Sequence, residues 1–144
     1  MSASALIIPG KMLMSQEATY RGTESLFGRE FGLSSDNLTA MLGLESAGCG
    51  VVVSGRSVMA AAILLPQRSR EIDVPFGVVD PNKRGEGHGS LLIGTIISYA
   101  RANNARSIRA ITEPQRHHMR YLLGKHGFVP SERGFDDEFK LELR

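Results

Sequence analysis

Residues 80–90 constrain the fold of this chain more than any other stretch. Three of them are glycines at alternate positions, Gly85, Gly87 and Gly89. The stretch lies between an apolar, β-type run at 72–79 and a helical run that follows Gly89. Such a turn lets successive backbone N–H groups face one point, and the following helix adds the positive end of its dipole. The sequence therefore predicts an anion site, suited to phosphate, between a strand and a helix.

The rest of the chain alternates between helical and strand patterns. Helical runs repeat apolar residues every three or four positions, and strand runs are β-branched or apolar and end at glycine, proline or polar residues. Strands are predicted at 5–8, 50–54, 57–65, 72–79, 107–112, 128–129 and 139–143. Between 90 and 102 the apolar positions predict an amphipathic helix, and another helix is predicted to start at Pro114 and to end at Gly127.

Two helical regions are predicted before the first long strand. Ser15 is a candidate cap for the first, which Gly22 and Gly28 should weaken or break. Ser34 and its two neighbours are candidate caps for the second, which should end at Gly48.

The order of the elements predicts a mixed sheet. Three consecutive strands between residues 50 and 79 favour an antiparallel meander, whereas the strand, helix and strand of 72–112 favour a parallel pair joined by a crossover. The fold class is therefore α/β (α+β), with a mostly antiparallel sheet. At 144 residues, the chain is expected to form a single domain over 1–144.

Charge and composition exclude several classes of protein. The formal charge of +2 is too small to indicate nucleic-acid binding, although the stretch 87–112 has no acidic residue and includes three arginines. The only apolar run near the start, 5–8, is too short for a membrane span or a signal. One cysteine, Cys49, allows no intramolecular disulfide, and a turn before a strand is a better interpretation of its surroundings than a catalytic thiol. A cytoplasmic protein without a metal is expected.

Two common phosphate loops do not fit residues 80–90. A Walker A loop needs a lysine before the Ser or Thr that opens the helix, and here His88 and Gly89 precede Ser90. A dinucleotide fingerprint needs the spacing GxGxxG and an acid about 20 residues later, and the chain has neither.

The stretch instead resembles the pyrophosphate loop of the GNAT acetyltransferases, written Q/R-x-x-G-x-G/A, through Arg84, Gly87 and Gly89. Residues 125–128, Lys-His-Gly-Phe, are similar to a second family motif, K-x-G-F. The resemblance covers roughly residues 50–143. It implies helices on both faces of the sheet and a central parallel strand pair that splays around acetyl-CoA, the acyl donor.

The resemblance also implies a set of cofactor-binding residues. The pantetheine arm would lie against the backbone of Val78 and Val79, and Arg116 takes the place of an asparagine that is usual in the family. The pyrophosphate would contact the loop itself: Arg84, Gly85, Glu86, Gly87, His88, Gly89 and Ser90.

Direct attack by an amine on the thioester needs a general base, because an ammonium group must first lose a proton. Glu71 is the first candidate and Asp73 the second, since strand alternation puts both on one face. A solvated strand end beside Arg68 and Arg70 explains the same carboxylates equally well. Many relatives carry a tyrosine as general acid where this chain has Leu123.

The acceptor is expected to be a primary amine on a small molecule or a protein. The alternative is a catalytically degenerate protein of the same fold, such as occurs among phage proteins, which would bind CoA or serve as a structural or regulatory partner. A homodimer is possible, with 139–143 as an available edge. His117 and His118 are predicted to be a solvent-exposed pair, and the acidic triplet 136–138 is either an attraction for a cationic acceptor or a solvated turn.

Overall fold

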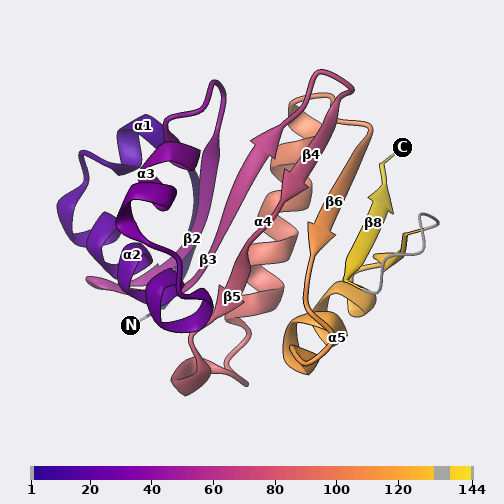
Figure 1. The fold of residues 1–144 in the computed structure, drawn as a ribbon. Helices are drawn as coiled ribbons and strands as arrows, with labels where there is room; N and C mark the ends of the chain where they lie inside the picture. Colours follow the sequence, from indigo (N-terminus) through magenta and orange to yellow (C-terminus); the bar gives the residue numbers. More distant parts are fainter. Residues whose placement is uncertain (1, 132–136, 144) are drawn as a thin grey trace.

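A computed structural model describes residues 2–131 and 137–143. Its centre is one twisted eight-stranded sheet with the order β1-β2-β3-β4-β6-β8-β7, and β5 pairs with β3 beside β4 (Figure 1). The strands are β1 (Ser4–Pro9), β2 (Gly48–Ser54), β3 (Ser57–Pro66), β4 (Glu71–Val74), β5 (Gly77–Val79), β6 (Ser107–Ile111), β7 (Val129–Pro130) and β8 (Glu138–Glu142). The helices are α1 (Gly10–Leu13), α2 (Glu17–Phe31), α3 (Ser35–Leu42), the 3-10 turn η1 (Pro81–Lys83), α4 (His88–Ala102) and α5 (His117–Lys125).

The predicted meander and the predicted parallel pair are both present. β2 pairs antiparallel with β3, and β3 pairs antiparallel with both β4 and β5. β4 pairs parallel with β6. The single strand predicted at 72–79 is wrong in one respect, because it divides into β4 and β5 at Pro75 and Phe76. Proline has no N–H to donate to a ladder, which favours a break at this point.

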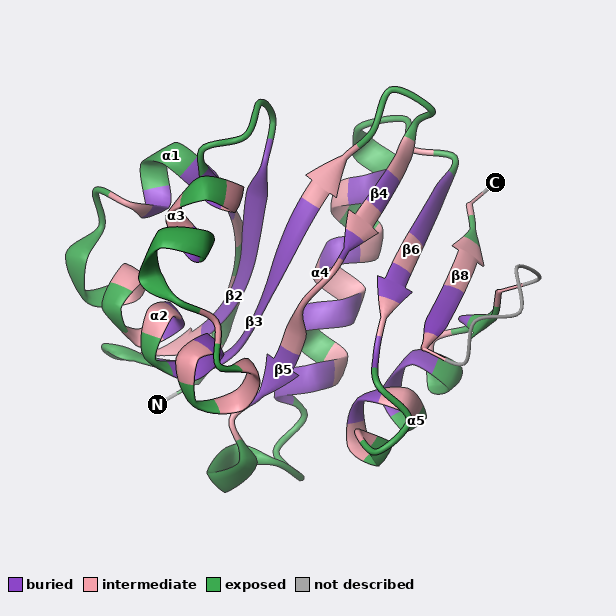
Figure 2. Cartoon of the chain, in the orientation of Figure 1, coloured by how far each residue is buried: buried purple, intermediate pink, exposed green. Residues whose placement is uncertain are grey.

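Helices cover both faces of the sheet, as expected. α1, α2 and α3 pack on one face over β1, β2 and β3, and α4 lies against the other face with α5 beside it (Figure 1). Each side has its own buried apolar cluster: Phe27 and Leu42 belong to the first, and Leu92 and Ile108 belong to the second. Figure 2 shows the buried strands β2 and β3 between these two layers.

The helix boundaries correct four predictions. α2 begins at Glu17 with no side-chain cap, so Ser15 does not cap it, and it continues through Gly22 and Gly28 to a left-handed Gly32. Packing of its buried face against β3 outweighs the propensity cost of the two glycines. The last helix begins at His117 and not at Pro114. For α3 the predicted cap is confirmed, because the Ser34 hydroxyl accepts a hydrogen bond from the N–H of Asn37. Its predicted end at Gly48 is wrong, because α3 ends at Leu42 with Gly43 as its C-cap.

The two outer edges of the sheet differ in length. β1 forms one edge over six residues, and the two-residue β7 lies outside β8 at the other. β7 pairs with Lys140 and Phe139, so the edge expected at 139–143 is partly covered. None of the helices in the described ranges is long and apolar enough to cross a membrane.

Candidate functional site

The glycine loop, residues 84–90, runs from the end of η1 into the first turn of α4, below β5 (Figure 1). The carboxylate of Asp80 accepts a hydrogen bond from the N–H of Asn82 and so caps η1. Gly85 and Gly87 then take φ values of +81° and +85°. A side chain rarely adopts this left-handed conformation, and a Cβ at either position would meet no other atom. Backbone conformation, and not crowding, therefore explains both glycines.

Gly89 has a different reason, because it lies in the first turn of α4 against α5. A Cβ here would overlap the Leu122 side chain and would come within 3.0 Å of Val79. The missing side chain lets the start of α4 approach both α5 and β5 closely. The first amides of α4 consequently open beside the end of β5, where a helix N-terminus favours an anion.

β5 has one free backbone edge next to the glycine loop. The N–H of Ile63 donates to Phe76, the N–H of Asp80 donates to Met59, and within the described residues β5 pairs with β3 alone. Because bonded residues alternate along an antiparallel strand, the backbone groups of Gly77 and Val79 face away from β3, toward β6. An extended ligand with amide groups can add to such an edge as a further strand.

A cleft of about 410 Å³ joins the free edge of β5 to the loop and to α5. Its volume falls in the usual range for a ligand site, roughly 300–1,000 Å³. Its lining comprises Arg29, Glu30, Gly77, Val78, Val79, Arg84, Gln115, Arg116, His117, His118 and Met119. The side chains of Val78 and Val79 are themselves buried in the two cores. Val79 therefore offers the cleft mainly its backbone, whereas the backbone of Val78 faces Ala61 of β3.

Positive charge gathers at the outer end of the cleft. Arg84 is exposed in the loop, and Arg29 reaches Asp80 with 3.8 Å between Nη2 and Oδ2. His118 is half-buried rather than solvent-exposed as predicted, and burial together with the charge of Arg84 lowers its pKa. His117 is exposed, as predicted. A neutral imidazole and two guanidinium groups thus surround the place where an anion would enter.

Arg116 connects α2 to the segment before α5. Its guanidinium lies 4.1 Å from the centre of the Phe31 ring, donates to the carbonyl of Glu30, and is 3.4 Å from a Glu113 oxygen. The side chain is therefore already bonded within the protein. Its contacts hold the C-terminal end of α2 against the cleft, so a positioning role for Arg116 fits this structure better than a direct cofactor contact.

The charged face consists of Glu71, Asp73, Arg109, Glu138 and Lys140. These side chains come from β4, β6 and β8, on the side of the sheet opposite α4. Arg109 donates from Nε and Nη2 to the two oxygens of Asp73, at 3.2 and 3.0 Å, and lies 3.5 Å from Glu138. The pKa of Arg109 is raised, mainly because its side chain donates hydrogen bonds to Asp73.

Both predicted catalytic carboxylates are members of this charged face. Glu71 accepts a hydrogen bond from the Ser107 hydroxyl at 3.0 Å and lies 3.6 Å from the Nζ of Lys140. Asp73 uses both oxygens on Arg109. They lie on one face, as strand alternation predicts, but they are ion-paired and not simply solvated. Asp73 is closer along the chain to the break at Pro75 and Phe76, where the free edge of β5 begins.

Glu138 is the site residue that sequence reasoning missed. It belongs to the acidic triplet, of which Asp136 lies outside the described residues. Only 3% of Glu138 is exposed, because it starts β8 and points at Arg109. No sequence signal distinguishes Glu138, because it follows the alternation of polar and apolar residues along 138–142 and its burial depends on the fold.

Two other features bear on the chemistry. Leu123 is buried in α5, whereas Tyr121 is exposed, so neither places a hydroxyl in the cleft. Cys49 lies fully buried in β2 rather than in a turn, and burial raises the pKa of its thiol to about 12. Over the ranges 2–131 and 137–143, no three His, Cys, Asp or Glu side chains are grouped to hold a metal ion.

Comparison with known proteins gives one family. The profile of the Acetyltransferase (GNAT) family matches residues 19–128. No curated protein matches the sequence. Among solved structures, the IAA acetyltransferase from Bacillus cereus has 16% identity and a TM-score of 0.76, covering 99% of this chain and 100% of that one.

Two further solved structures are similar to this chain. The GNAT domain of S. lividans PAT has 16% identity and a TM-score of 0.74, with 98% of this chain and 90% of that one covered. A GNAT family acetyltransferase from Elizabethkingia anophelis with acetyl-CoA bound has 14% identity and a TM-score of 0.69, with 83% and 89% covered. At these identities, the likeness concerns the fold.

Proposed function

The chain belongs to the acetyltransferase (GNAT) family and is an acyltransferase, and on this premise we propose that it moves an acetyl group from acetyl-CoA to a primary amine of a small molecule or a protein. One observation carries the proposal. Arg84 of the glycine loop, four residues before the start of α4 at His88, lines the same cleft as Gly77 and Val79 of the free edge of β5.

The residues present fit acetyl-CoA. The loop has the left-handed glycines and the helix N-terminus that a pyrophosphate needs, and Arg84 adds a positive charge beside them. The backbone of Gly77 and Val79 is available to the amide groups of a pantetheine arm. This supports the expectation for Val79, whereas the backbone of Val78 faces β3 and is not available. The contacts of Glu86 and His88 with each other, 3.3 Å apart, keep the loop in shape and leave its amides as the binding groups.

When bound, acetyl-CoA supplies the acetyl group as a thioester: the amine nitrogen forms a bond to the carbonyl carbon, the carbon–sulfur bond breaks, and CoA leaves as a thiolate. The protein contributes position first. Holding two reactants in line can recover about 7–11 kcal/mol of a reaction barrier. The cleft between β5, α2 and α5 is the part of this chain that would hold the donor.

The proton of the incoming ammonium group requires a base. Glu71 stays the first candidate and Asp73 the second, acting directly or through a water molecule. Glu71 has the weaker ion pairs, at 3.6 and 3.8 Å, while Asp73 bonds to Arg109 through both oxygens. A general base contributes about 10²–10⁴-fold to the rate.

The leaving thiolate does not need a tyrosine to give it a proton. A thiol has an ordinary pKa of about 8.5, so a thiolate leaves readily near neutral pH and can take its proton from water. Leu123 therefore does not exclude transfer. It does make a protein that binds acyl-CoA without transferring the acyl group the second candidate.

A transfer assay with an amine panel tests the proposal. Polyamines, amino acids, aminoglycosides and lysine peptides are offered with acetyl-CoA, and free CoA thiol is measured against time. We expect release with at least one amine, a loss of about 10²-fold or more in Glu71→Gln, and acetyl-CoA binding that survives this change. Binding without release for any amine would favour the second candidate, and absence of binding would contradict both.

A further inference from the structure

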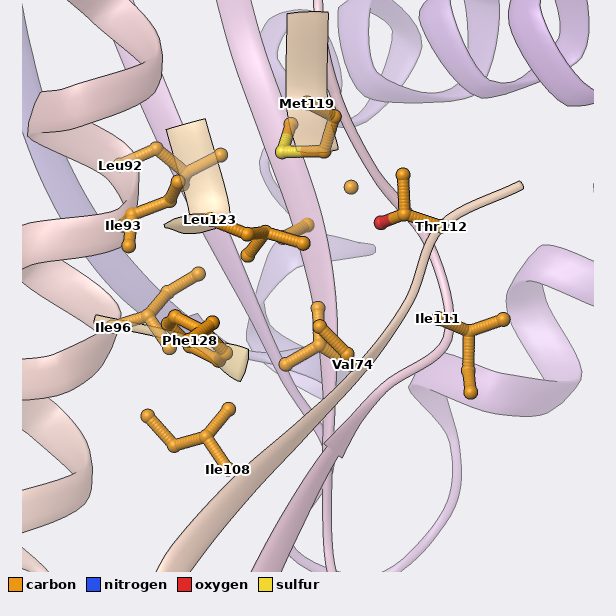
Figure 3. Close-up of a pocket in the computed structure, with 13 residues that line it drawn as sticks. Val74, Leu92, Ile93, Ile96, Ile108, Ile111, Thr112, Met119, Leu123 and Phe128 are labelled. Carbon is orange, nitrogen blue, oxygen red and sulfur yellow. The ribbon is translucent and has the colours of Figure 1, made fainter. Parts of the chain in front are cut away.

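An apolar cavity of about 30 Å³ lies in the interior between α4, α5 and the sheet. Figure 3 shows Leu123 at its centre, with Met119 and Thr112 at one end and Ile96 and Phe128 on the opposite side. Thr112 is the one labelled side chain there that carries an oxygen. A space with such a lining is suited to hydrocarbon, since small apolar cavities bind apolar molecules.

The cavity adjoins the cleft described above. Gly77 and Met119 line both spaces, and Val74, at the end of β4, lines the cavity just before the chain reaches Gly77. A ligand that extends from the glycine loop along the free edge of β5 therefore arrives at the mouth of the cavity. Its reactive end, and whatever is attached to that end, would point toward Leu123.

We propose that the cavity receives the alkyl end of an acyl group longer than acetyl, so that propionyl and butyryl thioesters are preferred donors. The inference rests on the proposed function and names the donor class of the same site. A single water needs about 10–15 Å³ of such space, so 30 Å³ accommodates one or two carbon groups beyond the acetyl methyl. A hydroxyl-bearing side chain at position 123 would make the centre of the cavity polar, whereas leucine makes it apolar.

The sizes of the effects follow from hydrocarbon transfer. Each methylene that moves from water into the cavity should tighten binding about fourfold. Propionyl and butyryl groups add one and two carbons and fit the available space. A hexanoyl group adds four, which overfills a packed interior and displaces Leu123 or its neighbours.

Calorimetric titration of the whole chain with CoA, acetyl-, propionyl-, butyryl- and hexanoyl-CoA tests the inference. We expect the dissociation constant of propionyl-CoA to be about fourfold lower than that of acetyl-CoA, and that of hexanoyl-CoA to be higher than that of butyryl-CoA. Acetyl-CoA binding as tightly as propionyl-CoA, or more tightly, would overturn the inference and leave the proposed function intact. Failure of every CoA species to bind would overturn both.

Two neighbouring leucines supply a matched pair of variants. Leu123 and Leu122 are both buried in α5, but only Leu123 lines the cavity, whereas Leu122 packs against Gly89. Leu123→Ala enlarges the cavity and should raise the affinity for hexanoyl-CoA relative to acetyl-CoA at least fourfold. Leu122→Ala should leave this ratio unchanged, whatever it does to overall affinity or stability. Equal ratios in both variants would show that the alkyl chain lies elsewhere.

Discussion

The glycine loop and the charged face contain all the polar residues predicted for function except Arg116, yet they are built in opposite ways. Residues 84–87 of the loop are exposed and offer backbone N–H groups, and Arg84 has no ion-pair partner among the described residues. On the charged face, Arg109 is surrounded by three carboxylates and only a quarter of its side chain is exposed. Changes in the loop should therefore alter ligand binding, and changes on the charged face should first alter stability.

The largest expected effect is that of Arg109→Leu. The substitution leaves Glu71, Asp73 and the buried Glu138 without their common cation, and breaking a pair of this kind costs about 3 kcal/mol. The free energy of unfolding from urea denaturation measures the loss. Arg106→Leu, at an exposed position before β6, is the control and should change it by less than about 0.5 kcal/mol. Similar losses in free energy of unfolding for Arg109→Leu and Arg106→Leu would mean that the charged face contributes no more to stability than an exposed arginine does.

Arg84→Glu should have the next largest effect, on binding rather than on stability. Loss of a charged hydrogen bond to phosphate corresponds to about a 10–100-fold rise in the dissociation constant of acetyl-CoA. Lys83→Glu makes the same change in charge one residue earlier, outside the cleft lining, and should raise it only a few-fold. The urea midpoint should stay constant in both variants. An equal rise in the dissociation constant for both variants would mean that Arg84 acts through general electrostatic attraction and not through a contact with the phosphate.

Two glycines of the same region should respond in opposite directions to alanine. Gly87 is left-handed, so Gly87→Ala should cost about 1–2 kcal/mol in free energy of unfolding and weaken acetyl-CoA binding. Gly94 lies inside α4, and a Cβ there meets no atom. Gly94→Ala should therefore stabilise the protein by up to about 1 kcal/mol without changing affinity. The same sign for both changes would contradict the loop geometry.

The smallest effect concerns pH. The pKa of His118 is lowered in the folded protein, so below its ordinary value of 6.5 the unfolded chain binds the proton more strongly. Stability is complete above pH 6.5 and decreases as pH falls through this value toward the lower folded pKa. Lowering the pH from 7.5 to about 5.5 should therefore lower the urea concentration at the midpoint of unfolding. This concentration should fall less in His118→Asn, and an equal decrease would mean that His118 is not the group responsible.

The sequence predicts the loop well because its causes are local. Glycine alternation, the strand before and the apolar period after are all contained within about thirty residues, and the structure has each of them. α4 begins at His88, close to its predicted start after Gly89. Local signals of this kind predict the structure reliably, because neighbouring residues largely determine the backbone conformation of such a turn.

The charged face and the contacts of Arg116 are harder to predict, because residues far apart in the sequence create them. Asp73 and Arg109 are 36 residues apart and meet only through the parallel pairing of β4 with β6. Nothing near Glu138 indicates that β8 will place it beside the same arginine. The contacts of Arg116 with Phe31 and Glu30 likewise join α2 to a segment more than eighty residues later. Pairing over such separations depends on the whole fold.

The measurement that tests the central claim most directly is an amide NMR titration of ¹⁵N-labelled protein with acetyl-CoA. If the glycine loop binds the pyrophosphate through its backbone, the amide signals of Gly85, Gly87 and Gly89 should shift most, and those of β8 should shift least. Saturation at 100 times the dissociation constant should also stabilise the protein by about 2.7 kcal/mol. Absence of shifts in the loop, with or without binding elsewhere, would contradict the account.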